Sequence, residues 1–321
     1  MVMDNIDVAG LVQKADQRAR PFLRQTILEY SHYFSGRSAA NVYFKCENMQ
    51  HTGSFKVRGA MNKLLSLSDP ERKQGVVTAS TGNHGAAVAF GLKQVNTHGI
   101  VFVPENASKS KVLNIEQLGA EVRSYGLDSA KTEGYARQYA AQHDMIYISP
   151  YNDPQIIGGQ GTIAVELAQQ LEYIDVVFVS LGGGGLISGI AGYLKSVFPQ
   201  VEVIGCSPEH SQVMIQSVLA GEILDLPSKP TLSDGTAGGV EPDSITFPLC
   251  QQLVDSYITV NEDEIVTSLR EFMSAQHMLI EGSAAVAIAA FQQVKSRFAG
   301  KNVVIVLCGA NIGLSKLKEI L

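Results

Sequence analysis

Four consecutive glycines stand where an apolar run of strand length gives way to a helical segment. The run 182–185 follows the stretch 175–179 and precedes Leu186 and an apolar segment with helical spacing. Consecutive glycines let backbone N–H groups converge at a helix start, where the helix dipole also favours an anion. Neither the Gly-x-Gly-x-x-Gly spacing nor a following Gly-Lys-Ser or Gly-Lys-Thr is present, so dinucleotide and nucleoside-triphosphate sites are not indicated. A plain turn needs fewer glycines, so the run predicts a phosphate site.

A second polar turn contains Ser80, Thr81, Asn83 and His84 and joins the apolar stretch 76–79 to an alanine-rich helical segment. Its hydroxyls, amide and backbone donors at a helix start suit a carboxylate or a ring oxygen. Serine and threonine are also common helix caps. Taken alone, the turn leaves the two interpretations open.

Lys56 and Cys308 are two further candidates for chemistry. Alone, Lys56 would be a solvated helix residue, and Cys308, which follows the buried run 303–307, would be a small buried hydrophobe. Together with a phosphate site and a hydroxyl-and-amide turn, a lysine suits an aldehyde cofactor that carries a phosphate. The lysine forms a Schiff base with such a cofactor once desolvation lowers its pKa.

The elements that must position these residues alternate between strand-like and helix-like segments. Such alternation predicts parallel βαβ units, and strands that are apolar throughout are typical of sheets covered by helices on both faces. We therefore predict an open α/β fold, which binds ligands at the carboxyl ends of its strands. The long loop 225–248, rich in proline and glycine, is a further functional candidate. The strand-like runs are 99–103, 145–148, 176–179, 201–204 and 303–307.

Composition excludes several classes of protein. The 321 residues are 45% hydrophobic and 17% charged, with no apolar run of membrane-spanning length. Twenty-five basic against 31 acidic residues give a net charge of −6, which disfavours nucleic acid as a partner. Residues 1–20 lack the features of a secretory signal, so we expect a cytoplasmic protein. No zinc site or disulfide framework is indicated, because the cysteines are widely spaced: Cys46, Cys206, Cys250 and Cys308.

Six motifs in order resemble the serine/threonine dehydratase and serine racemase family, which are pyridoxal-phosphate enzymes of the tryptophan-synthase β fold (fold type II). The resemblance covers nearly the whole chain. It implies two α/β domains with open, mostly parallel sheets: a large one from 1–70 and 151–321 that binds the cofactor, and a small one, 71–150, that closes over the substrate. It also suggests a homodimer. The motifs begin at Ser54, Ser80, Gly182, Leu232, Glu281 and Cys308.

The resemblance also implies a role for each site residue. Lys56 would hold pyridoxal 5'-phosphate as a Schiff base and move protons at Cα, with Phe55 packed against the ring. Asn83 would hydrogen-bond the ring 3-oxygen, and Cys308 would lie beside the pyridine nitrogen. Ser80, Thr81 and His84 would line the substrate-carboxylate pocket, and Gly235 would approach the ring from the opposite face. The phosphate would receive backbone N–H groups from Gly182, Gly183, Gly184, Gly185 and Leu186.

These roles favour a particular reaction. A thiol of pKa about 8.5 does not keep the pyridine nitrogen protonated, so prompt loss of a β-hydroxyl is favoured over a long-lived carbanion. We expect L-threonine and/or L-serine to be converted to 2-oxobutanoate or pyruvate plus ammonia by β-elimination. Racemases of the family carry a second serine where this chain has Thr81, whose methyl group crowds that face.

Other functions stay open. The enzymatic alternatives are an amino-acid (serine) racemase and a 3-hydroxyaspartate or hydroxyectoine-pathway dehydratase. The alternative outside enzymes is a ligand-binding regulator built on this fold. A 3-hydroxyaspartate substrate would require an additional cation, which the sequence does not place. The segment 232–239 resembles the hydroxyectoine branch. A divalent cation is left uncertain, because Ser207 replaces the first carboxylate expected of cation-binding members and only Glu209 follows nearby.

Overall fold

Six strands form the larger of two sheets in the computed structural model, which describes residues 6–321. β1 pairs antiparallel with β2, and every other neighbouring pair in the order β1-β2-β10-β7-β8-β9 is parallel. The predicted mostly parallel α/β fold is confirmed. The strands are β1 (Leu28–Tyr30), β2 (Asn41–Lys45), β7 (Val176–Ser180), β8 (Glu202–Pro208), β9 (Ser256–Val260) and β10 (Asn302–Val306).

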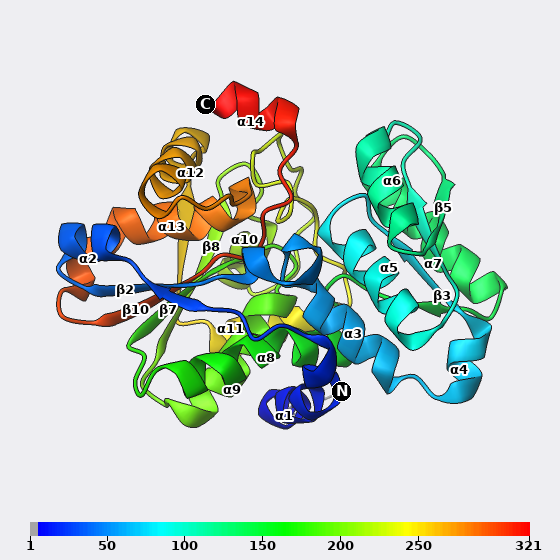
Figure 1. The fold of residues 1–321 in the computed structure, drawn as a ribbon, viewed down its shortest axis with the longest axis horizontal. Helices are drawn as coiled ribbons and strands as arrows, with labels where there is room; N and C mark the ends of the chain where they lie inside the picture. The colour runs from blue at the N-terminus through cyan, green and yellow to red at the C-terminus, as the bar shows by residue number, and fades with distance from the viewer. Residues whose placement is uncertain (1–5) are drawn as a thin grey trace.

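Helices cover both faces of this sheet, which explains why the central strands β7 and β10 carry buried apolar residues on both faces. In Figure 1, α12 and α13 lie on one side of the sheet and α8 and α9 on the other, with α1 packed against α8. The helices are α1 (Val8–Ala19), α2 (His32–Ser38), α8 (Pro154–Gln170), α9 (Gly185–Val197), α10 (Val213–Ala220), α11 (Thr246–Leu253), α12 (Glu262–Gln276), α13 (Gly282–Val294) and α14 (Leu314–Ile320).

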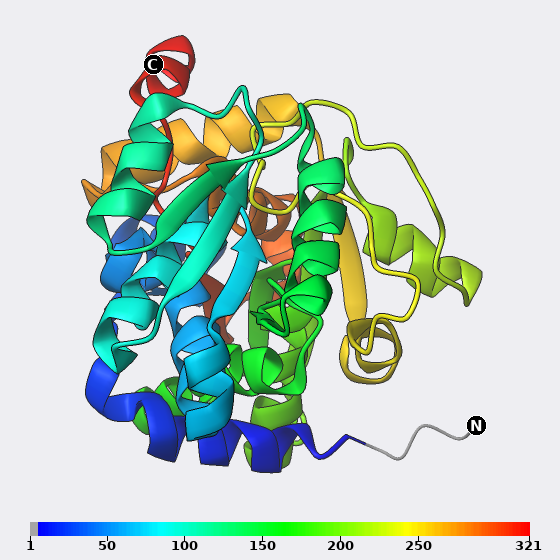
Figure 2. The same cartoon turned by 90° about the vertical axis from the view of Figure 1, so that its right-hand side faces the viewer.

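A second, four-stranded sheet is built entirely from residues 76–147 and is parallel throughout, in the order β5-β4-β3-β6. Figure 2 brings this sheet and its helices to the front. Helix α3 packs against both α5 of this region and α8 of the large sheet, so it joins the two layers. The elements are α3 (Lys56–Ser66), α4 (Asp69–Gln74), β3 (Val76–Ala79), α5 (Asn83–Val95), β4 (Gly99–Val103), α6 (Lys109–Gln117), β5 (Glu121–Ser124), α7 (Ser129–Gln142) and β6 (Ile146–Tyr147).

A buried ion cluster of Lys45, Glu47, Arg58 and Glu166 fixes the first turn of α3. All four side chains are fully buried. The Arg58 guanidinium donates from Nε to Glu47 Oε2 at 2.7 Å and from Nη1 to Glu166 Oε1 at 2.8 Å. Lys45 Nζ donates to Glu166 Oε2 at 2.6 Å. Because Arg58 is two residues beyond Lys56, the cluster sets where that lysine emerges from the helix.

Three strands end immediately before predicted site loops. β3 ends at Ala79, β7 at Ser180 and β10 at Val306. The Lys56 segment is attached to the loop after β10, because Phe55 N–H donates to the Cys308 carbonyl at 3.1 Å. No helix within residues 6–321 has the length and apolar character needed to cross a membrane.

Candidate active site

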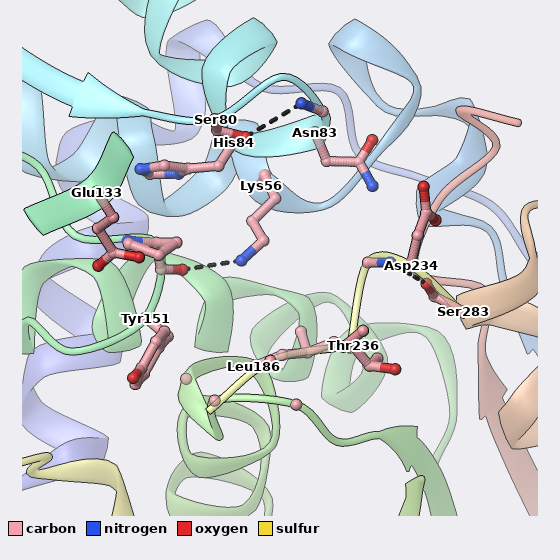
Figure 3. Close-up of a pocket in the computed structure, with 18 of the residues that line it drawn as sticks. Lys56, Ser80, Asn83, His84, Glu133, Tyr151, Leu186, Asp234, Thr236 and Ser283 are labelled. Carbon is pink, nitrogen blue, oxygen red and sulfur yellow. Dashed lines mark hydrogen bonds between the residues drawn. The ribbon is translucent and has the colours of Figure 1, made fainter. Parts of the chain in front are cut away.

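A cavity of about 690 Å³ is lined by the loops at the carboxyl ends of both sheets. Every site residue predicted from the sequence lines this cavity, and Figure 3 shows Lys56, Ser80, Asn83, His84 and Leu186 converging on it. The predicted residues brought together here are Phe55, Lys56, Ser80, Thr81, Asn83, His84, Gly182, Gly183, Gly184, Gly185, Leu186, Gly235 and Cys308.

Lys56 is the first residue of α3, and its amine reaches into the cavity (Figure 3). Nζ donates to the Pro150 carbonyl at 2.9 Å. Burial lowers the pKa of Lys56 to about 8, although the Cys308, Glu281 and Glu133 side chains oppose the shift. An amine with this pKa is partly neutral near neutral pH and so can attack an aldehyde.

The glycine run forms the amino end of α9. Gly184 takes φ +87°, a left-handed conformation that favours glycine. A Cβ at Gly182 would lie 2.8 Å from the Thr236 carbonyl oxygen, and one at Gly183 would lie 2.5 Å from the Tyr151 ring. The first N–H groups of a helix have no acceptor within it, so they are free to bind an anion here.

The Ser80 turn forms the amino end of α5. Gly82 N–H donates to Ser80 Oγ at 3.1 Å. The amide nitrogen of Asn83 donates to both carboxylate oxygens of Glu281, at 2.9 and 3.1 Å, and its oxygen accepts from Asn311 Nδ2. Asn83 is therefore held from two sides with its amide at the cavity wall.

His84 is buried, and its Nε2 donates to the Ile148 carbonyl at 3.1 Å. Burial, together with the positive charge of Lys56, lowers the pKa of His84 to about 3. The ring is therefore neutral near pH 7 with its proton on Nε2. Nδ1 is then an acceptor, and it has no hydrogen-bond partner among the described residues.

Glu281 had no assigned role in the sequence, although its Glu-Gly-Ser motif was recognisable. It accepts from Asn83 and from Asn311 N–H, the latter at 2.8 Å. Burial raises the pKa of Glu281 to about 7, against the effect of the Asn83 hydrogen bond. Cys308 is also buried, and desolvation, followed by the Glu281 charge, raises the pKa of its thiol well above the usual range. Cys308 is therefore an uncharged thiol.

A charged wall of Glu133, Arg137 and Glu241 also lines the cavity and was not predicted. Glu133 and Arg137 belong to α7, and Glu241 to the long loop between α10 and α11. Arg137 Nη2 donates to Glu133 Oε1 at 2.9 Å and to Glu241 Oε1 at 2.7 Å. In the sequence, only the length of the loop that carries Glu241 indicated a functional role for this wall. Glu133 and Arg137 gave no such indication, because charged pairs four residues apart are common on the surfaces of helices.

The segment considered for a divalent cation does not gather ligands. Ser207 is buried and its hydroxyl donates to the Leu181 carbonyl at 2.7 Å, whereas Glu209 is exposed. Within residues 6–321 no group of three or more His, Cys, Asp or Glu side chains is placed to hold a metal ion. The structure of this segment therefore adds no support for a divalent-cation site.

Comparisons with known proteins agree with this geometry. Residues 19–309 match the family model for pyridoxal-phosphate dependent enzymes. The chain is 37% identical to an L-threonine ammonia-lyase of Thermotoga maritima, over 97% of this chain and 77% of that protein. It is 38% identical to a catabolic L-threonine dehydratase of Escherichia coli K12, over 96% and 94%. An L-threo-3-hydroxyaspartate ammonia-lyase of Saccharomyces cerevisiae is 34% identical, over 96% and 94%.

Two solved structures are similar over nearly their whole length. The processed form of threonine deaminase isoform 2 from Solanum lycopersicum has a TM-score of 0.94 and 32% identity, covering 99% of this chain and 93% of that one. Serine racemase from Dictyostelium discoideum has a TM-score of 0.88 and 35% identity, covering 95% and 99%. The chain belongs to the family of pyridoxal-phosphate dependent enzymes, with the fold type II architecture.

The residues present fit this cofactor. The glycine run leaves space where side chains would collide with Thr236 and Tyr151, and it presents the amino end of α9 to a phosphate. Across the same cavity, Lys56 presents an amine with a lowered pKa to an aldehyde. An anion site and a nucleophilic amine within one cavity match the two ends of pyridoxal 5'-phosphate.

Proposed function

We propose that this protein is an ammonia-lyase (dehydratase) that converts L-threonine and L-serine to 2-oxobutanoate and pyruvate, with release of ammonia. The observation that carries the proposal is the meeting of Lys56, the amino end of α5 and the glycine run around one cavity. The threonine ammonia-lyases and dehydratases among the relatives support it.

In this proposal, each element has one task. The bound cofactor withdraws electrons from Cα of the attached amino acid and so acidifies the Cα–H bond. The amino end of α5, with Ser80 and Thr81, binds the substrate carboxylate, and His84 shapes the pocket beside it. Gly182–Leu186 bind the phosphate, while Phe55, Asn83 and Gly235 orient the ring. Lys56 accepts the Cα proton.

The reaction balances as a loss of water followed by hydrolysis. The Cα–H and Cβ–O bonds break, and the hydroxide leaves with a proton as water. The released enamine becomes an imine, which water hydrolyses to the 2-oxo acid and ammonia. The uncharged Cys308 thiol would lie beside the ring nitrogen and would favour elimination, because a thiol would leave the ring a weaker electron sink than a carboxylate would.

Racemisation is the second candidate, because the Thr81 hydroxyl lines the cavity in the turn where racemases of this family carry a serine. We rank it below dehydration because the Thr81 methyl group adds bulk beside that hydroxyl. The proposal also includes a cytoplasmic homodimer whose segment 71–150 closes as a small domain over the part formed by 1–70 and 151–321.

A parallel assay separates the candidate functions. The holoenzyme is incubated with L-threonine or L-serine, the 2-oxo acid and ammonia are quantified, and the recovered amino acid is analysed on a chiral column. Equal amounts of 2-oxo acid and ammonia with residual L-substrate support the dehydratase. D-amino acid without 2-oxo acid would establish a racemase, and ligand-induced stabilisation without turnover would indicate a non-enzymatic binder.

A further inference from the structure

The charged wall carries more negative than positive charge. Arg137 is shared between Glu133 and Glu241, so one guanidinium balances two carboxylates. Glu241 is fixed in addition by Asn152, whose Nδ2 donates to Oε2 at 2.8 Å, and by its own N–H, which donates to the Tyr151 hydroxyl at 2.9 Å. Arg137 also lies over the Tyr147 ring, 4.2 Å from its centroid. The guanidinium is therefore held in place by three groups.

The other cation on the cavity lining, apart from Lys56, is Lys111. Its amine lies 3.7 Å from the Asp234 carboxylate, which reaches the cavity from the loop before Gly235. Among the described residues that line the cavity, both Arg137 and Lys111 thus have carboxylate partners already. The amino end of α5 offers neutral donors for the α-carboxylate of an amino acid. A second carboxylate on the substrate would have to compete with a protein carboxylate for its cation.

Glu133 lines the cavity together with Lys56. Figure 3 shows its side chain on the side toward which the Lys56 amine points. Its charge also acts on Lys56, because it is one of three groups that oppose the lowering of the Lys56 pKa. Because Glu133 lines the cavity, its carboxylate repels a negative charge brought into the cavity, and this repulsion is stronger than it would be in water.

We propose that Glu133, with Arg137 held by Glu241, determines substrate specificity by admitting an uncharged β-hydroxy side chain and rejecting one that bears a carboxylate. This inference rests on the proposed function and narrows its substrate class to monocarboxylic β-hydroxy amino acids. It separates this chain from an enzyme for 3-hydroxyaspartate, for which the cavity would need a cation without a carboxylate partner.

The test compares kcat/KM for L-threonine and L-threo-3-hydroxyaspartate in the wild-type holoenzyme, Glu133→Gln and Glu116→Gln. Glu116 is an exposed carboxylate of α6 outside the cavity, so its variant controls for overall charge. We expect kcat/KM of the wild type to be about tenfold higher, or more, for L-threonine than for L-threo-3-hydroxyaspartate. Glu133→Gln should reduce this ratio by about tenfold, mainly by lowering KM for the substrate that carries two carboxylates. Glu116→Gln should leave the ratio unchanged.

The inference would be overturned by equal efficiency of the wild type on both substrates or by an unchanged ratio of efficiencies in Glu133→Gln. Hydroxyaspartate turnover that disappears in Arg137→Gln would instead make Arg137 a carboxylate receptor. Absence of turnover with all substrates would refute the proposed function but not the charge selection. In that case, charge selection is tested by the dissociation constants of L-2-aminobutyrate and L-aspartate, measured from the cofactor absorbance. Tighter binding of L-aspartate, or a ratio of the two dissociation constants that Glu133→Gln leaves unchanged, refutes the inference.

Discussion

At the scale of single residues, desolvation determines the chemistry of the site. Burial lowers the pKa of Lys56 to about 8 and that of His84 to about 3, and it raises the pKa of Glu281 to about 7. The site thus combines an amine that is partly neutral, a neutral imidazole and a carboxyl group that titrates near neutrality. Lys56 and Glu281 are therefore able to exchange protons near neutral pH, whereas His84 stays uncharged.

Lys56→Ala should remove both the visible absorbance of the bound cofactor and all dehydratase activity, because Lys56 is the lining amine that burial leaves partly neutral and so able to attack an aldehyde. The matched control is Lys73→Ala, an exposed lysine of α4 that does not line the cavity. Absorbance and 2-oxo acid production are measured for both variants. Full turnover in Lys56→Ala would contradict the assigned role.

The lowered pKa of Lys56 predicts how fast the apoprotein takes up its cofactor. Only the neutral amine attacks the aldehyde, so the uptake rate should rise as the pH passes through about 8 and then level off. Stopped-flow absorbance after mixing apoprotein with pyridoxal phosphate measures this rate. A rate that still rises steeply around pH 10, where an ordinary lysine titrates, would show that burial does not lower the pKa.

At the scale of elements, the sequence predicted the loops well because short motifs at strand ends leave few alternatives. The glycine run, the Ser80 turn and the Cys308 loop all occupy the expected carboxyl ends of parallel strands. The charged wall could not be predicted, since Arg137 and Glu241 are 104 residues apart and meet only through the packing of α7 against the long loop. The Asn83–Glu281 contact escaped prediction for the same reason.

Gly182→Ala should weaken cofactor binding by about tenfold or more, because its Cβ would lie 2.8 Å from the Thr236 carbonyl and push the glycine run out of position. Gly36→Ala is the control, because Gly36 lies in α2 and its added Cβ would meet nothing outside the helix backbone within 4 Å. The dissociation constant of pyridoxal phosphate is measured by titrating each apoprotein. Unchanged affinity in Gly182→Ala would place the phosphate elsewhere.

At the scale of the whole molecule, the buried ion cluster connects the chemistry to stability. It joins β2, α3 and α8, three elements from distant parts of the sequence, and it lies under the turn that presents Lys56. Sequence reasoning saw Arg58 only as part of a motif, because burial of four charges cannot be read from composition. The division into large and small domains remains a prediction.

Glu166→Gln should lower the free energy of unfolding by about 3–5 kcal/mol, because it leaves Arg58 and Lys45 buried with a single carboxylate. The exposed Glu172, just beyond the same helix, supplies the control Glu172→Gln, which should change stability little. Thermal and urea unfolding of the two variants are compared with the wild type. Equal stability of all three proteins would show that the cluster does not hold α3.

The central claim is that Lys56 and the glycine run bind pyridoxal phosphate for the dehydration of β-hydroxy amino acids. An absorbance spectrum between about 300 and 500 nm, recorded while L-threonine is added and 2-oxobutanoate is quantified, tests it most directly. We predict a cofactor band that changes on addition of L-threonine and 2-oxobutanoate that accumulates in step with ammonia. A protein that shows no band after addition of pyridoxal phosphate, or a band with no 2-oxo acid from L-threonine or L-serine, would contradict the account.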